Sequence, residues 1–146
     1  VHPNARSSFV GINVSHTRKH LLRSVYEGIV YCHKYHVDKL LANRSVPPRC
    51  LRLAGGAAKS PVWTQMFADI LQLPVETVQV NETGALGCAI AVAAIAGMST
   101  INTAVEPNRD YAELYARKYA LYLKTIQCLD GLWDEMQAYI QEEDPC

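Results

Sequence analysis

The feature that most constrains the fold is a pair of short apolar runs that enclose a glycine turn and a helical pattern. Residues 50–54 read Cys-Leu-Arg-Leu-Ala, and residues 75–80 read Val-Glu-Thr-Val-Gln-Val. Between them, Gly55-Gly56 ends the first run and Ser60-Pro61 opens a helix, since serine caps free amides and proline suits the first helical position. Strands that alternate with helices form parallel sheets through right-handed crossovers. The sequence therefore predicts an α/β fold with parallel strands and covering helices.

A helix is predicted before this unit, and a strand before that helix. Apolar side chains at Leu22, Val25, Ile29 and Cys32 recur every three or four residues, which is the spacing of one helical face. We therefore expect a helix over residues 17–43. Residues 9–14 are a candidate strand.

Two further helices are predicted after the second strand. Residues 85–96 are small and apolar on every side, which predicts a helix buried on several faces, about half as long as a membrane span. Residues 98–110 are expected to be irregular. A long helix is predicted over residues 109–142, interrupted by Gly131, because large side chains form a single seam along it. The seam consists of Tyr115, Tyr119, Tyr122, Ile126, Leu129, Trp133, Met136 and Ile140.

The amino-acid composition limits the class of protein to which this chain can belong and the kinds of partner that it can bind. Hydrophobic residues make up 49% of the 146-residue chain and charged residues 19%, which indicates a globular domain rather than a disordered segment. Lys+Arg and Asp+Glu number 14 each, so bulk charge favours neither a nucleic-acid nor a membrane partner. The 5 cysteines are scattered and form no CxxC pair, which suits the reduced thiols of a cytoplasmic protein without a signal peptide. Two predicted strands form too small a sheet to cover the apolar helices predicted around them. We therefore expect this chain to be part of a larger α/β domain.

The glycine turn is not a P-loop. That motif places one glycine directly before its lysine and another five residues earlier, where this chain has Ala58 and Leu53. From the residues alone, Gly55-Gly56 is more often a plain tight turn than a nucleotide contact. Lys59 is expected to be a solvated loop lysine rather than a phosphate ligand.

Other polar and aromatic residues are given structural roles. The Cys and His residues of the first helix have the spacing of metal ligands, but no carboxylate or second Cys clusters near them, so no metal site is predicted. These residues are His16, His20, Cys32, His33 and His36. Glu82 is read as a helix cap without a catalytic role. Trp63 and the tyrosine seam are expected to pack within the protein rather than to stack on a ligand.

Three blocks of the sequence resemble the C-terminal region of the FGGY family of carbohydrate kinases. They read "HTRKHLLRSVYEGIVY", "LRLAGGAAKSPVWTQMFADILQLPV" and "ETGALGCAIAVAAIAG", and their order is specific although each alone is weak. The segments "HPNARSSFVGI" and "LYARKYALYLK" are also similar to the xylulokinase and L-xylulose kinase group. The resemblance implies an actin-like (ribonuclease-H-like) fold, of which residues 1–146 are the later part of the nucleotide-side domain.

The resemblance also implies a role for the glycine turn in an ATP-dependent pentulose kinase. Gly55, Gly56 and Ala57 would lie against the adenosine of ATP, because glycine lets the backbone approach a ligand closely. The resemblance implies that Ser60 also faces the purine; it stands where relatives place an asparagine that contacts the purine, and its side chain is shorter. ATP and Mg²⁺ are the implied cofactors, with the Mg²⁺ site mainly outside this chain.

The same resemblance implies that other parts of the kinase lie outside these residues. The first domain, the sugar site, the catalytic aspartate and the Gly-Thr phosphate turn are expected upstream, so no catalytic residue is assigned in this chain. We expect the sugar to be bound mainly by that other domain, and the isolated chain to be inactive and to self-associate. A non-catalytic binding or assembly module of the same fold, or a kinase for gluconate or a polyol, are the alternatives.

Overall fold

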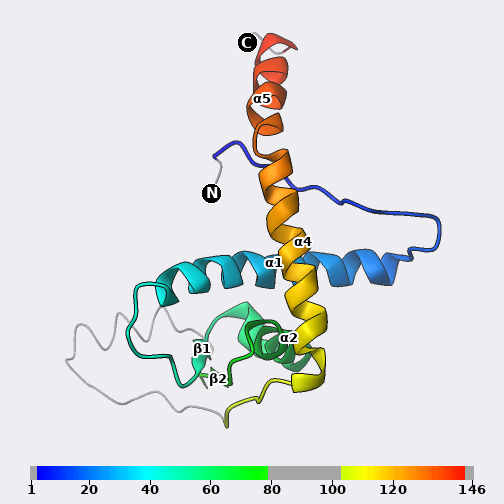
Figure 1. The fold of residues 1–146 in the computed structure, drawn as a ribbon. Helices are drawn as coiled ribbons and strands as arrows, with labels where there is room; N and C mark the ends of the chain where they lie inside the picture. The colour runs from blue at the N-terminus through cyan, green and yellow to red at the C-terminus, as the bar shows by residue number, and fades with distance from the viewer. Residues whose placement is uncertain (1–2, 79–102, 144–146) are drawn as a thin grey trace, which may run out of the picture.

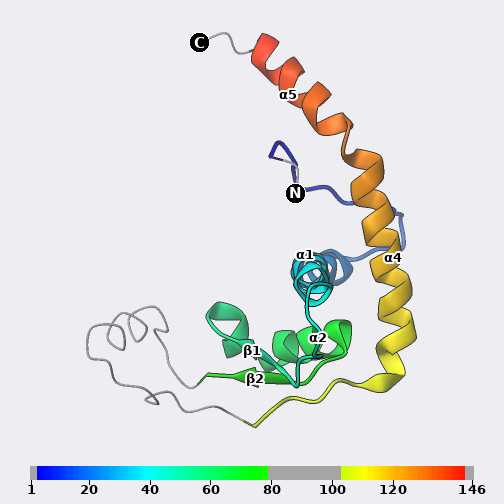
Figure 2. The same cartoon turned by 60° about the vertical axis from the view of Figure 1, so that its left-hand side comes forward.

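The structure is a computed structural model that describes residues 3–78 and 103–143. The predicted helix over residues 85–96, the end of the second predicted strand and the Glu82 cap lie outside the described residues. The elements, in chain order, are α1 (Arg18–Leu41), β1 (Leu51–Leu53), the 3-10 turn η1 (Gly56–Lys59), α2 (Pro61–Leu71), β2 (Val75–Thr77), the 3-10 turn η2 (Arg109–Tyr111), α4 (Ala112–Leu129) and α5 (Leu132–Glu143). Figures 1 and 2 show α2 between the two strands and α4, and Figure 1 shows α1 crossing behind α4.

The strands β1 and β2 pair in parallel, as the sequence predicts. Leu51 lies opposite Val75, and the Leu51 amide donates to the Pro74 carbonyl over 2.8 Å. Val75 also exchanges both backbone hydrogen bonds with Val105, at 2.9 and 2.7 Å, in an isolated antiparallel bridge. This bridge was not predicted, because residues 98–110 were expected to be irregular. It anchors the chain that leads into α4 beside β2.

Helix α2 is the centre of the described body. Ser60 caps it and Pro61 occupies its first position, which confirms the predicted start. Between Thr64 and Leu71 every residue of α2 except Gln65 is buried, because α1, α4 and β2 all contact this helix. The core consists of Val30, Tyr31, Met66, Phe67, Ala68, Ile70, Leu71, Val75 and Tyr115.

Helix α1 forms where the sequence predicts it, but its buried side is a different one. The Thr17 amide donates to His20 Nδ1 over 3.1 Å at the helix start. The buried residues are Glu27, Val30 and Tyr31, whereas Leu22 is 53% exposed. The described parts of α2 and α4 lie against the Glu27–Tyr31 side. The apolar spacing therefore identified the helix, and not the face that these neighbours cover.

The C-terminal region is helical, as predicted, but consists of two helices rather than one. Helix α4 ends at Leu129 and α5 begins at Leu132, so the break falls at Asp130 and Gly131. Glycine and aspartate are poor helix formers, which explains the break at this point. In both views α5 extends away from the strands (Figures 1 and 2).

The predicted strand over residues 9–14 is wrong. These residues have no regular secondary structure, and Phe9, Val10, Ile12 and Val14 are exposed. No strand of the described residues pairs with them, and an extended segment without a pairing partner is not a strand. The chain before them contacts α5 instead, because Asn4 Nδ2 donates to Asp134 Oδ1 over 2.8 Å and Arg6 Nη2 donates to Gln137 Oε1 over 2.9 Å.

Candidate functional site

The residues predicted to face a nucleotide lie on the turn that joins β1 to α2. Gly55 follows the carboxyl end of β1, Gly56 and Ala57 open the η1 turn, and Ser60 caps α2. Ligands of open α/β sheets bind outside the carboxyl ends of the strands. The turn therefore occupies the edge of the sheet at which this class of fold binds ligands.

The two glycines of the turn differ in what they require. Gly55 has φ 82° and ψ −156°, a region of backbone conformation that only glycine adopts without strain. Gly56 has no such constraint. An added Cβ at either glycine would have no described atom within 4 Å. The main chain at both glycines is therefore uncovered on the side where a side chain would stand. A ligand can approach the main chain closely only where it is uncovered in this way.

Hydrogen bonds hold the turn against the first turns of α2. The Ala58 amide donates to the Gly55 carbonyl and the Ser60 amide to the Ala57 carbonyl, each over 3.2 Å. The Thr64 hydroxyl, which is buried, also donates to the Ala57 carbonyl over 3.4 Å. The Ser60 hydroxyl accepts from the Trp63 amide over 3.3 Å. The serine oxygen therefore serves the helix cap, and its predicted contact with a purine stays a prediction.

The neighbouring side chains are arranged as the sequence reading expected. Lys59 is exposed at the end of η1. The Trp63 ring meets the Tyr26 ring edge-on, with centroids 4.9 Å apart, and lies 6.2 Å from the Phe67 ring. Its buried Nε1 has no hydrogen-bond partner among the residues that the structure describes. Trp63 thus joins α1 to α2 by aromatic contacts.

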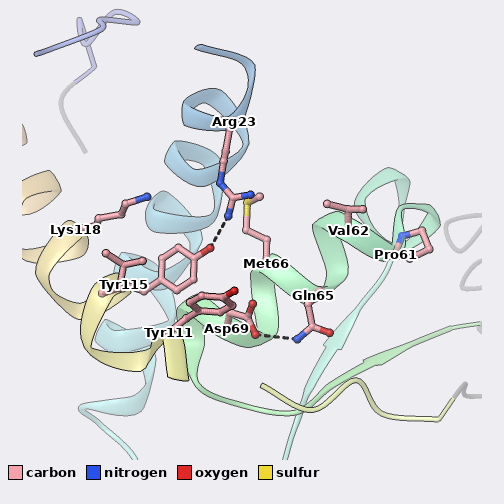
Figure 3. Close-up of a pocket in the computed structure, with 10 residues that line it drawn as sticks. Arg23, Pro61, Val62, Gln65, Met66, Asp69, Tyr111, Tyr115 and Lys118 are labelled. Atoms are coloured by element: carbon pink, nitrogen blue, oxygen red, sulfur yellow. Dashed lines mark hydrogen bonds between the residues drawn. The ribbon is translucent and has the colours of Figure 1, made fainter. Parts of the chain in front are cut away.

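A cavity of about 590 Å³ lies beside α2, where α1 and α4 meet it (Figure 3). It begins at Pro61 and Val62, directly after the capping serine. Its lining combines apolar side chains with cationic and acidic ones. The sequence did not predict this cavity, because its residues come from four separate elements, α1, α2, η2 and α4. The lining residues are Arg23, Pro61, Val62, Gln65, Met66, Asp69, Tyr111, Leu114, Tyr115 and Lys118.

A buried carboxylate forms ion pairs with the two cationic side chains that line this cavity. Glu27 is 6% exposed and forms ion pairs of 2.8 Å with both Arg23 and Lys118. Arg23 Nη2 also donates to the Tyr115 hydroxyl over 2.9 Å (Figure 3). Burial raises the pKa of Tyr115, so this phenol stays neutral at physiological pH. Each cation therefore already has an anionic partner within the domain.

Asp69, which also lines the cavity, fixes the chain that enters α4. Its Oδ1 accepts from Gln65 Nε2 over 2.8 Å and from the Asn108 amide over 2.7 Å (Figure 3 shows the first bond). A buried carboxylate needs such donors, because burial without them is costly. Asp69 is therefore a structural anchor.

The candidate metal ligands do not come together. The His33 ring faces Phe67 with centroids 5.6 Å apart, and His36 Nδ1 lies 2.8 Å from the Cys32 carbonyl of its own helix. Within residues 3–78 and 103–143, no three Cys, His, Asp or Glu side chains are placed to hold a metal ion. Over the same residues, no helix has the length and apolar character needed to cross a lipid bilayer.

The comparisons with known proteins cover most of the chain. Residues 1–96 match the C-terminal domain of the FGGY family of carbohydrate kinases. The L-xylulose/3-keto-L-gulonate kinase of Escherichia coli (strain K12) is 37% identical over 138 residues, which are 86% of this chain and 27% of that protein. The chain therefore spans little more than a quarter of the length of such relatives.

Solved structures agree with this result. A crystal structure of xylulose kinase from Rhodospirillum rubrum superposes with a TM-score of 0.73 and 26% identity, over 90% of this chain and 29% of that one. A ligand-bound xylulose kinase from Lactobacillus acidophilus has a TM-score of 0.80 at 24% identity, over 91% of this chain and 29% of that one. These matches confirm the predicted fold class, the later part of an actin-like kinase domain. The chain belongs to the FGGY family of carbohydrate kinases.

Proposed function

We propose that this chain forms the adenosine-binding wall of an ATP-dependent kinase that phosphorylates a pentulose such as xylulose. One observation carries the proposal: the backbone of Gly55 and Gly56 is uncovered and lies at the carboxyl edge of parallel strands, where η1 leads to the N-terminus of α2. Glycines at such a turn allow a ligand to approach the main chain. The relatives named as L-xylulose and xylulose kinases support the choice of a pentulose.

We assign the adenosine end of ATP, rather than its phosphates, to this turn, as the resemblance of the sequence to FGGY kinases implies. The side chains that follow the glycines are the small Ala57 and the capping Ser60, while Lys59 is exposed. ATP supplies the phosphoryl group of the reaction, and the residues of this chain would hold its nucleoside against the turn. The described residues offer no cluster for Mg²⁺. We therefore assign no metal ligand and no catalytic residue here, and propose that both belong to the remainder of a longer kinase.

Binding of ADP to the chain tests the proposal, with isothermal titration as the measurement. Gly56→Ala and Gly56→Val form a size series, since neither side chain would meet a described atom at its Cβ in the free protein. We expect ADP affinity to fall with each step, by about tenfold or more for Gly56→Val. Gly28→Ala is the control, because it adds the same Cβ to open space on α1. Equal ADP affinity in all variants would show that the turn is only structural.

A second measurement tests whether residues 1–146 are catalytically active on their own. An assay of ADP release with D- or L-xylulose should detect no sugar-dependent turnover by residues 1–146. Turnover would contradict the assignment of the catalytic base to another part of the protein. Absence of ADP binding would instead favour the alternative, a non-catalytic module of the same fold.

A further inference from the structure

The buried Thr64 hydroxyl ties the candidate nucleotide turn to α2. Thr64 is 2% exposed and lies in the second turn of the helix. A threonine within a helix commonly bonds the carbonyl four residues earlier. Here the Thr64 Oγ1 reaches seven residues back, to the Ala57 carbonyl over 3.4 Å.

The Ala57 carbonyl is thereby held from two sides. It accepts from the Ser60 amide over 3.2 Å as well as from the Thr64 hydroxyl. The next amide, that of Ala58, donates to the Gly55 carbonyl over 3.2 Å. The orientation of the Ala57–Ala58 peptide is thus coupled to that of Gly55. Because the glycines add no side chain to fix the turn, these hydrogen bonds set its shape.

We infer that Thr64 is a positioning residue, whose hydroxyl holds the Gly55–Ala57 backbone in the shape that receives the nucleotide. This inference rests on the proposed function of the turn. Thr64 does not reach the ligand surface, because its side chain is buried beneath the turn. Its effect on the ligand therefore passes through the Ala57 carbonyl.

Two substitutions separate the hydroxyl from the bulk of the side chain. Thr64→Val keeps the shape and removes the hydroxyl, whereas Thr64→Ser keeps the hydroxyl and removes a methyl group. We expect Thr64→Val to weaken ADP binding about threefold to fivefold, because a 3.4 Å bond between a hydroxyl and a carbonyl is long, and Thr64→Ser to stay within about twofold of the parent protein. In the ligand-free protein, Thr64→Val should also speed backbone amide exchange at Ala58 and Ser60.

The opposite order would overturn the inference. If Thr64 only fills space, Thr64→Ser should be the more damaging change, and Thr64→Val should leave both ADP affinity and amide exchange as they are. Gly56→Val distinguishes this failure from failure of the proposed function. If Gly56→Val weakens ADP binding but Thr64→Val does not, the inference alone is wrong. If amide exchange responds as expected while neither variant alters ADP binding, the hydroxyl holds the turn and the turn does not bind nucleotide.

Discussion

At the scale of single residues, the two glycines of the turn should differ in how much stability an added methyl group costs. Gly55 has φ 82° and ψ −156°, whereas Gly56 has no left-handed backbone, and neither has a described atom within 4 Å of a built Cβ. We expect Gly55→Ala to lower the free energy of unfolding by about 1–3 kcal/mol, because alanine is strained in that region. Gly56→Ala should change it by less than about 0.5 kcal/mol.

Urea unfolding of the two variants checks this prediction. Since the steric surroundings are open at both positions, the difference between them reports backbone conformation alone. Equal losses of stability would mean that the turn tolerates no Cβ at all. In that case the ADP titration of Gly56 variants would need correction for unfolded protein.

The sequence predicted the helix start that follows the turn, but not the hydrogen bonds within the turn. Ser60-Pro61 is a local helix-start signal, and the structure places both residues in those roles. Two adjacent glycines do not reveal which one needs a positive φ, because that depends on how the chain leaves β1. The bond from Thr64 to the Ala57 carbonyl depends on the η1 turn, which a pattern of apolar spacing does not encode.

At the scale of elements, the spacing of apolar residues predicted α1, β1, α2 and β2, but it did not predict which of their side chains contact one another. Glu27 illustrates the reason. A charged residue is ordinarily assigned to a solvated face, yet Glu27 is buried because Arg23 comes from its own helix and Lys118 from α4. The second partner is 91 residues away in sequence, so no local pattern could indicate it. The cavity beside α2 was missed for the same reason.

The contact between α1 and α4 carries a prediction for alkaline pH. The Tyr31 ring lies 5.4 Å from Tyr122 and 6.0 Å from Tyr119, so the first part of the predicted seam packs within the protein. Burial raises the pKa of Tyr122 from 10.0 to about 12, and burial likewise raises the pKa values of Tyr31 and Tyr119. The folded state therefore holds these protons more tightly than the unfolded state does.

The sign of the pH dependence follows from that difference. The stability contributed by Tyr122 is fully present below about pH 10 and is lost as the pH rises toward about 12. Urea unfolding at increasing pH, read together with tyrosinate absorbance, measures the loss. Tyr122→Phe should flatten the decline, and Tyr139→Phe, at an exposed position on α5, should not. A decline of equal slope in the Tyr122→Phe variant would assign the effect to other groups.

At the scale of the whole molecule, the described body has surfaces that its own residues leave uncovered. Leu22, Val25 and Ile29 of α1 are exposed, and so are apolar residues of the segment before it. The described sheet has only the two strands β1 and β2. The chain spans 27% of the length of its Escherichia coli relative.

The free edge of β1 leads to the final prediction, that residues 1–146 self-associate. Within the described ranges, β1 pairs only with β2, whereas Tyr119 and Tyr122 of the seam pack against Tyr31 of α1. The Leu51 amide points toward β2, so the backbone of Arg52 points to the outer edge, because alternate residues of a strand face opposite neighbours. Unpaired strand edges recruit other chains.

We expect the mean mass in sedimentation experiments to rise with protein concentration. Arg52→Pro removes the outward amide and should shift the chain toward monomer, since proline blocks edge pairing. Arg52→Ala is the matched control: it removes the 3.1 Å ion pair with Glu76 but keeps the amide, and should associate like the parent. A compact monomer with a sharp thermal transition at every concentration would contradict the prediction. Equal association of both variants would place the contact on the exposed apolar side of α1, because that surface is unchanged by either substitution.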